Sequence, residues 1–275
     1  MLSPPCPLAC LVPLAALALA AAGPAHAQTR PLVTEAAETA PAGTLDFETG
    51  FDLIADEPSY VTGHERTRWD GPLLRLTWSP ADAVELDVDW VARVGVAGDP
   101  ARGGAQSSDF GDVTLRVKWR VAGGGGRPDL AVRFGATLPQ TSYEDVQKRP
   151  LGLGPNTIRA FVEGLATRRA GRGRLLASAG LLLFDDVYRP HDQVDFFTYG
   201  AALEWPVSKR LAAVAEIAGR TGHPTPGAEV RCEARAGVRY AREGLRLDAA
   251  VRRGIATADG TWGVTAGMGL VLRRR

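Results

Sequence analysis

The sequence predicts an all-β protein, a closed antiparallel transmembrane β-barrel of about twelve strands with short periplasmic turns and longer extracellular loops. Three observations predict this fold. Apolar and polar residues alternate with a period of two in successive segments from Thr44 onward. Short and long connections alternate between these segments, and aromatic residues lie near both of their ends.

The alternating segments carry one charged face and one apolar face made of small residues. In EVRCEARAGVRY (229–240), the arginines and Glu233 share one parity, and alanine, valine and Cys232 share the other. A soluble sheet needs bulkier inward residues to pack a core, whereas lipid accepts Ala and Val. A closed sheet also crosses hydrocarbon without unpaired backbone groups. The expected strands are 44–54, 72–78, 84–96, 112–121, 129–138, 157–167, 174–184, 195–205, 211–220, 229–240, 245–255 and 261–272.

The connections between these strands alternate in length, which predicts hairpins whose two ends face different compartments. Those after the even strands are tight, as in SPAD (79–82) and PVSK (206–209). Those after the odd strands are mostly longer and polar, as in 55–68 and 139–154. Outer-membrane barrels have this plan, and a β-sandwich has no reason to keep it along the whole chain.

Aromatic residues near the strand ends predict two girdles at the membrane interfaces. One girdle is expected beside the tight turns and the other near the opposite rim, where Phe184 is also placed. The expected girdle residues are Trp78, Trp119, Trp205, Tyr240, Phe197, Tyr199 and Trp262.

The amino terminus reads as a signal peptide over residues 1–27, with an apolar core and small residues before a cut after Ala27. An Ala-rich tail is the alternative. Residues 28–43 are expected to form a short periplasmic lead-in, too short to act as a full plug, and residues 44–275 form the barrel. Processing would leave Cys232 as the remaining cysteine, on an apolar face, so it is expected to be a small hydrophobe.

Charged residues of the inward parity are the candidate lumen lining. On the third and fourth strands, a register in which Val96 faces Asp109 would pair Glu85 with Arg120. We interpret this ladder as structural, and a field that orients polar solutes is the alternative. The candidate lining residues are Arg75, Glu85, Asp87, Asp89, Arg116, Lys118, Arg120, Arg133, Glu163, Glu204, Glu216, Arg231, Glu233, Arg235 and Arg252.

A basic patch is expected on the tenth and eleventh strands, interrupted by Glu233 and Asp248. It could attract anionic solutes, or it could be a solvated wall balanced by acids elsewhere. The patch consists of Arg231, Arg235, Arg239, Arg246 and Arg252.

Three segments resemble the bacterial outer-membrane transporters known as phenol-degradation meta-pathway proteins. They are DFGDVTLRVKWR (109–120), AVRFGATLPQTS (131–142) and YGAALEWPVSKRLAAVAEIAGR (199–220). The matching features are the Gly-Asp entry to a strand at 111–112, the Leu-Pro step at 138–139, and an inner Glu216. The resemblance implies an outer-membrane barrel that passes small, including aromatic, molecules.

We therefore expect a porin-like channel for passive diffusion in the outer membrane, whose partners are the lipid bilayer, the barrel-assembly machinery and an unidentified small solute. A non-conducting outer-membrane barrel that acts as a structural or adhesion element through its loops is the first alternative. An outer-membrane lipase and a soluble secreted β-sandwich are the others. Because the net charge is +1, no nucleic-acid partner is expected. No catalytic residue, cofactor or metal is expected, because the histidines lie in loops without a serine in a nucleophile-elbow pattern.

Overall fold

A computed structural model describes residues 30–273, except 101–102, 105, 125, 141–152, 155–156, 187–188 and 190–191. The expected signal peptide, residues 1–27, lies outside the described residues. None of the described residues forms a helix that is long and apolar enough to span a membrane.

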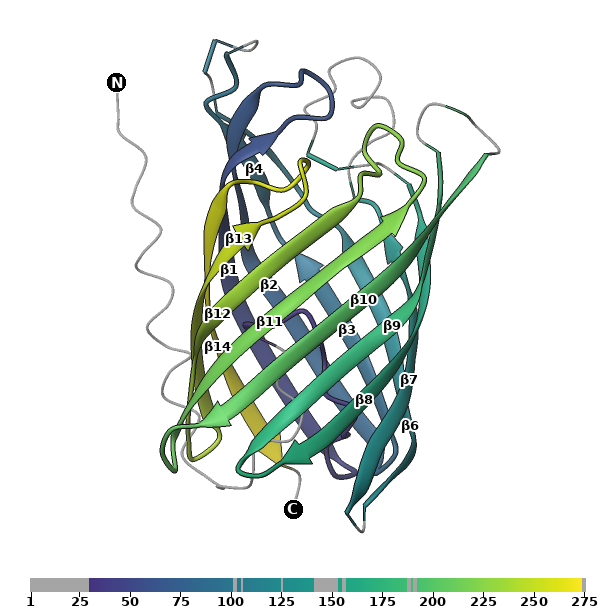
Figure 1. Ribbon diagram of the computed structural model, residues 1–275, viewed down its shortest axis with the longest axis vertical. Coiled ribbons are helices and arrows are strands. Elements are labelled where there is room, and N and C mark those ends of the chain that lie inside the picture. Colours follow the sequence, from purple (N-terminus) through teal and green to yellow (C-terminus); the bar gives the residue numbers. More distant parts are fainter. Residues whose placement is uncertain are drawn as a thin grey trace.

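The described chain folds into one antiparallel sheet that closes on itself (Figure 1). Closure is made by β1, which pairs with both β2 and β14. The strands are β1 (Thr44–Pro58), β2 (Glu65–Ala81), β3 (Val84–Val91), β4 (Val94–Ala97), β5 (Ser107–Asp109), β6 (Val113–Gly124), β7 (Arg127–Leu138), β8 (Arg159–Ala170), β9 (Gly173–Asp185), β10 (Gln193–Pro206), β11 (Leu211–Gly222), β12 (Arg231–Arg242), β13 (Leu245–Gly254) and β14 (Trp262–Arg273).

The barrel has twelve strands, although the sheet carries fourteen labels. β3 and β4 both pair with β2, so they are one barrel strand interrupted at Ala92 and Arg93. β5 and β6 likewise form one strand, interrupted at residues 110–112. The expected closed antiparallel barrel of about twelve strands is confirmed, and the β-sandwich alternative is wrong.

The two ends of the barrel differ in the length of their connections (Figure 1). The end with short turns is called the turn end here, and the end with longer connections is called the loop end. At the turn end, β2–β3, β8–β9 and β12–β13 are joined by residues 82–83, 171–172 and 243–244. At the loop end the connections are longer, and the longest, between β7 and β8, comprises residues 139–158. The carboxyl end of the described chain lies at the turn end.

The two faces of the wall have opposite chemistry, as the period-two pattern predicts. Large apolar side chains such as Leu76, Val238 and Val251 point outward and are 44%, 46% and 59% exposed. Charged side chains such as Lys118 and Arg246 point inward and are 0% and 1% exposed. A water-soluble sheet protein has the reverse arrangement, because its apolar side chains must leave water.

Two local expectations were wrong. The register of the third and fourth barrel strands differs by two residues from the expected one, since Val96 faces Ser107 and Glu85 faces Lys118. In the connection between these strands, Gly103 and Gly104 adopt positive φ angles, which glycine allows without strain. A shift of two residues keeps every side chain on its predicted face. β2 also begins at Glu65, seven residues before the expected start at Pro72.

Candidate functional site in the barrel lumen

The lumen is crossed by the residues that precede the first strand. Residues 30–43, here called the lumen segment, lie inside the barrel (Figure 1, purple). Leu32, Thr34, Ala37 and Ala40 are each at most 5% exposed. Residues 28–43 are predicted to form a short periplasmic lead-in, and the described ones, 30–43, lie among the inward side chains of the barrel.

Glu216 on β11 holds the middle of the lumen segment. Its carboxylate accepts hydrogen bonds from the backbone N–H groups of Val33, at 2.9 Å, and Thr34, at 2.5 Å. Arg235 on β12 donates to the Pro31 carbonyl at 2.9 Å, and Arg239 donates to the Arg30 carbonyl at 2.9 Å. Charged lumen residues therefore satisfy the backbone groups of a segment that pairs with no strand.

Glu35 anchors the segment to the opposite wall. Its carboxylate pairs with Arg133 on β7 and lies 3.5 Å from the Lys118 ammonium on β6. Burial, the largest single influence, would raise the pKa of this carboxyl. The charges of Lys118 and Arg133 outweigh it and hold the Glu35 pKa well below its usual value. The two cations therefore favour the ionised form of Glu35 inside the barrel.

The end of the segment descends toward the turn end of the lumen. The Ala37 N–H donates to Thr167 at 2.8 Å, the Ala40 N–H donates to Glu85 at 2.6 Å, and Glu38 pairs with Arg174 at 3.1 Å. Small side chains let the backbone approach the wall closely. Two apolar clusters complete the packing, one of Leu32, Ala36, Leu176, Ala202 and Val214 and one of Ala37, Ala131 and Leu165.

Arg30 lies at the seam between the first and last strands. Its guanidinium donates to Asp52 on β1 at 3.2 Å and to the Thr265 hydroxyl on β14 at 2.5 Å. Glycines make room for it, because a β carbon at Gly50 or Gly267 would overlap the guanidinium. The segment is therefore fixed at both ends.

The loop end of the lumen holds a cavity of about 340 Å³, here called the upper cavity. Its wall combines apolar side chains with ion pairs. Arg66 pairs with Glu57 at 3.5 Å, and Arg68 pairs with Asp70 at 3.0 Å. The cavity is lined by Arg159, which pairs with Asp112.

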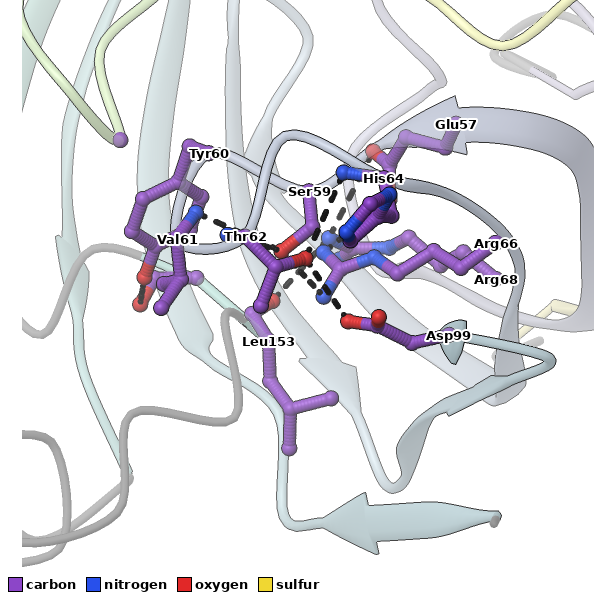
Figure 2. A network of polar contacts seen from close by, with 12 residues as sticks. Glu57, Ser59, Tyr60, Val61, Thr62, His64, Arg66, Arg68, Asp99 and Leu153 are labelled. Atoms are coloured by element: carbon purple, nitrogen blue, oxygen red, sulfur yellow. Dashed lines mark hydrogen bonds and ion pairs between the residues drawn. The ribbon is translucent and has the colours of Figure 1, made fainter. Parts of the chain in front are cut away.

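Loops at the mouth of this cavity are joined by the polar contacts that Figure 2 shows. Arg68 donates to the Leu153 carbonyl at 3.0 Å, and the Tyr60 hydroxyl donates to the Gly154 carbonyl at 2.9 Å. Thr62 donates to Asp99 at 2.9 Å. The mouth is therefore fixed by bonds between three separate loops.

Two further cavities lie on opposite sides of the lumen segment. A middle cavity of about 260 Å³ is lined by Val33 and Thr34. A lower cavity of about 200 Å³ at the turn end is lined by Ala36. The upper and middle cavities share Arg220 and Arg231 in their linings. The lumen segment thus separates the space toward the loop end from the space toward the turn end.

The predicted lining residues of the third and fourth strands meet one another and the lumen segment. Lys118 pairs with Glu85 at 2.5 Å, and Arg75 pairs with Asp89 at 2.5 Å. Asp89 also pairs with Arg116, diagonally across the strands. The remaining pairs are Asp87 with Thr77, Arg133 with Glu163, Glu163 with Thr198, Glu204 with Arg239, and Arg120 with the Asp82 carbonyl.

The expected basic patch is balanced by carboxylates. Arg231 pairs with Glu57 at 3.4 Å, Arg252 pairs with Glu233 at 2.6 Å, and Arg246 pairs with Asp46 at 2.5 Å. Arg235 and Glu233 form another pair at 2.6 Å. Each of these arginines thus has an acidic neighbour.

The expected girdle residues point outward. Trp78, Trp119, Trp205, Phe197 and Trp262 are between 46% and 55% exposed, and Tyr199 and Tyr240 are half-buried.

Phe184 differs from the other aromatic residues named with the girdles. It is 3% exposed and packs in a buried cluster with Phe196, Val194 and Ala228. Its parity on β9 directs it into the lumen, which the expected strand end did not indicate.

Sequence reasoning missed several functional residues. Asp46 and Glu48 neutralise Arg246 from β1, and Glu57 holds three arginines at the loop end. A count of inward acids on the first strand against inward arginines on the eleventh would have suggested such pairs. Among the described residues, no group of His, Cys, Asp and Glu could hold a metal ion.

Part of the chain matches one known protein family. A family model described as uncharacterised conserved protein UCP029691 matches residues 154–272. No curated protein sequence matches the chain.

Two solved structures resemble the chain in fold. The COG4313 outer membrane channel from Pseudomonas putida F1 has a TM-score of 0.64 and 16% sequence identity, covering 86% of this chain and 97% of that one. The translocator domain of autotransporter NalP from Neisseria meningitidis has a TM-score of 0.52 and 12% identity, covering 84% of this chain and 89% of that one. At these identities the likeness shows a shared barrel fold.

Proposed function

We propose that the protein is an outer-membrane channel through which small solutes pass by passive diffusion. The observation that carries this proposal is the arrangement of the wall. Its outward face is apolar and rimmed by exposed tryptophans, and its inward face is ionic and lines the upper, middle and lower cavities. Such a wall suits a cylinder with lipid outside and water inside.

The size of the cavities limits the solute. The upper cavity, of about 340 Å³, is large enough for a molecule of roughly ten to fifteen heavy atoms. Small organic solutes, including the aromatic ones suggested by the resemblance to phenol-degradation meta-pathway transporters, fit this volume. The P. putida F1 structure with this fold is that of an outer membrane channel, which is consistent with this proposal.

The lumen segment favours a second candidate, a barrel that does not conduct and acts through its loops. The segment separates the middle and lower cavities, and its backbone is bonded to walls on opposite sides. Conduction therefore needs a gap beside the segment or its partial release.

Single-channel recording on the purified protein in planar bilayers distinguishes the two candidates. Heat-modifiable gel mobility first establishes that the preparation is folded, because folded barrels resist SDS until boiled. The channel proposal expects small, discrete current steps. Silent bilayers with folded, inserted protein would reject the channel in favour of the non-conducting barrel.

A further inference from the structure

Arg220 differs from the other arginines around the upper cavity. Four arginines in this lining, Arg66, Arg68, Arg159 and Arg231, each contact a carboxylate. Within the described part of the chain, Arg220 has no carboxylate within ion-pair distance. Its charge is therefore left without a counterion in the part of the lumen that two cavities share.

The guanidinium of Arg220 is nevertheless held in place. Its Nε donates to the Glu229 carbonyl at 2.8 Å, and its Cζ lies 5.0 Å from the Phe196 ring centroid and 5.9 Å from that of Phe184. Both rings are almost fully buried. The backbone bond and the ring contacts fix the guanidinium and leave both terminal nitrogens without a hydrogen-bond partner among the described residues.

Electrostatics favours an anion at this position. Arg220 lies directly opposite Arg231 in the register of β11 and β12, and like charges opposite each other destabilise a sheet. Glu57 and Asp259 neutralise Arg231. An anion at the two terminal nitrogens of Arg220 would relieve the remaining repulsion.

We propose that Arg220 is the docking group for the carboxylate of a small organic acid whose apolar body lies in the upper cavity. The carboxylate matches the two terminal nitrogens of a guanidinium. The body would meet apolar side chains that line the same cavity, namely Ile54, Val91, Val94, Phe110 and Leu153. The site deepens the channel proposal and depends on it for its role, since it lies at the junction of the upper and middle cavities.

The test is equilibrium binding of cyclohexanecarboxylate to the folded full-length protein in non-ionic detergent, followed by calorimetry. Cyclohexanecarboxamide, which has the same shape and no charge, is the comparison ligand. The carboxylate is expected to bind and the carboxamide to bind at least about tenfold more weakly, because a hydrogen bond to a charged group is lost. Equal binding of the two ligands would overturn the proposal, and so would no binding of either.

Variants locate the site. Arg220→Gln is expected to weaken carboxylate binding at least about tenfold, and Arg220→Lys, which keeps the charge without the fork, to have an intermediate effect. Arg253→Gln is the control. Arg253 lies on the neighbouring wall, but it is exposed and does not line the cavity. Unchanged binding by folded Arg220→Gln protein, or equal losses in both glutamine variants, would reject the assignment.

The carboxylate site and the channel can each be rejected without rejecting the other. Calorimetry in detergent requires no current, so binding by a protein that is silent in bilayers would reject the channel and keep the carboxylate site. Current steps without carboxylate binding would reject the site and keep the channel.

Discussion

At the turn end of the lumen, Lys118 and Glu85 are fully buried beneath the lumen segment, whereas at the loop end Arg231 leaves 31% of its side chain exposed. Both halves have inward walls of alternating acids and bases. In the turn-end half these side chains bind one another and the backbone of residues 30–43. In the loop-end half they surround a cavity.

An inward wall of alternating acids and bases can therefore either hold a protein segment or leave space for a solute. A carboxylate that meets backbone N–H groups, as Glu216 and Glu85 do, binds a chain tightly without apolar packing. At the loop end Asp70 pairs with Arg68 and Asp112 pairs with Arg159, and neither carboxylate is bonded to the lumen segment. The segment therefore lies where inward carboxylates meet its backbone N–H groups.

Deleting residues 30–42 is expected to have the largest effect. Removal of the segment would join the middle and lower cavities, so single-channel conductance in planar bilayers should rise several-fold. A variant in which these residues are replaced by a Gly-Ser sequence of equal length controls for the altered connection to β1 and should also conduct more. An unchanged conductance in both variants would mean that the segment does not limit passage.

Ion pairs in the two halves should differ in their contribution to stability. Lys118→Met leaves Glu85 buried without its cation and is expected to lower the free energy of unfolding by about 3 kcal/mol. Arg231→Gln, at the wetter loop end, should lower it by at most about 1 kcal/mol. Urea unfolding in lipid vesicles measures both values. Equal losses would contradict the contrast drawn between the halves.

Glu216→Gln tests the capture of backbone by carboxylate. The amide oxygen can replace only part of the charge-assisted bonding to Val33 and Thr34, so docking of the segment should weaken by about 2 kcal/mol. Hydrogen exchange at these two amides should accelerate roughly thirtyfold. Asp87→Asn is the control, because Asp87 is an inward carboxylate bonded to Thr77 instead of to the segment. Equal acceleration in both variants would mean a general loosening of the barrel.

The pH dependence of docking should be the smallest effect. A carboxyl whose pKa is lowered on docking stabilises the docked state above its ordinary pKa, about 4.3, and this contribution is lost as pH falls through the lowered value. Because the Glu35 pKa lies well below its usual value, exchange at residues 33–37, corrected for the intrinsic pH dependence of exchange, should be constant between about pH 7 and pH 5. Release of the segment near pH 5 would contradict the pairing of Glu35 with Lys118 and Arg133.

The barrel could be predicted from the sequence because its signal is repeated in every strand. A two-residue register error on the third and fourth strands left Glu85 and Lys118 on the correct face. The lumen segment could not be predicted in this way, because its position depends on Glu216, Glu85 and Arg235, which are distant in sequence and meet only after the sheet closes. Arg220 was likewise not distinguished from its neighbours, since parity does not show which arginine lacks an acid.

The position of Arg30 bears on the order of events during maturation. Its guanidinium touches both margins of the cylinder, Asp52 on the first strand and Thr265 on the last. Before the barrel closes, the first and last strands are not paired, so the guanidinium can contact both only after closure. The time at which the amino-terminal residues become resistant to an added aminopeptidase would therefore report when the barrel has closed.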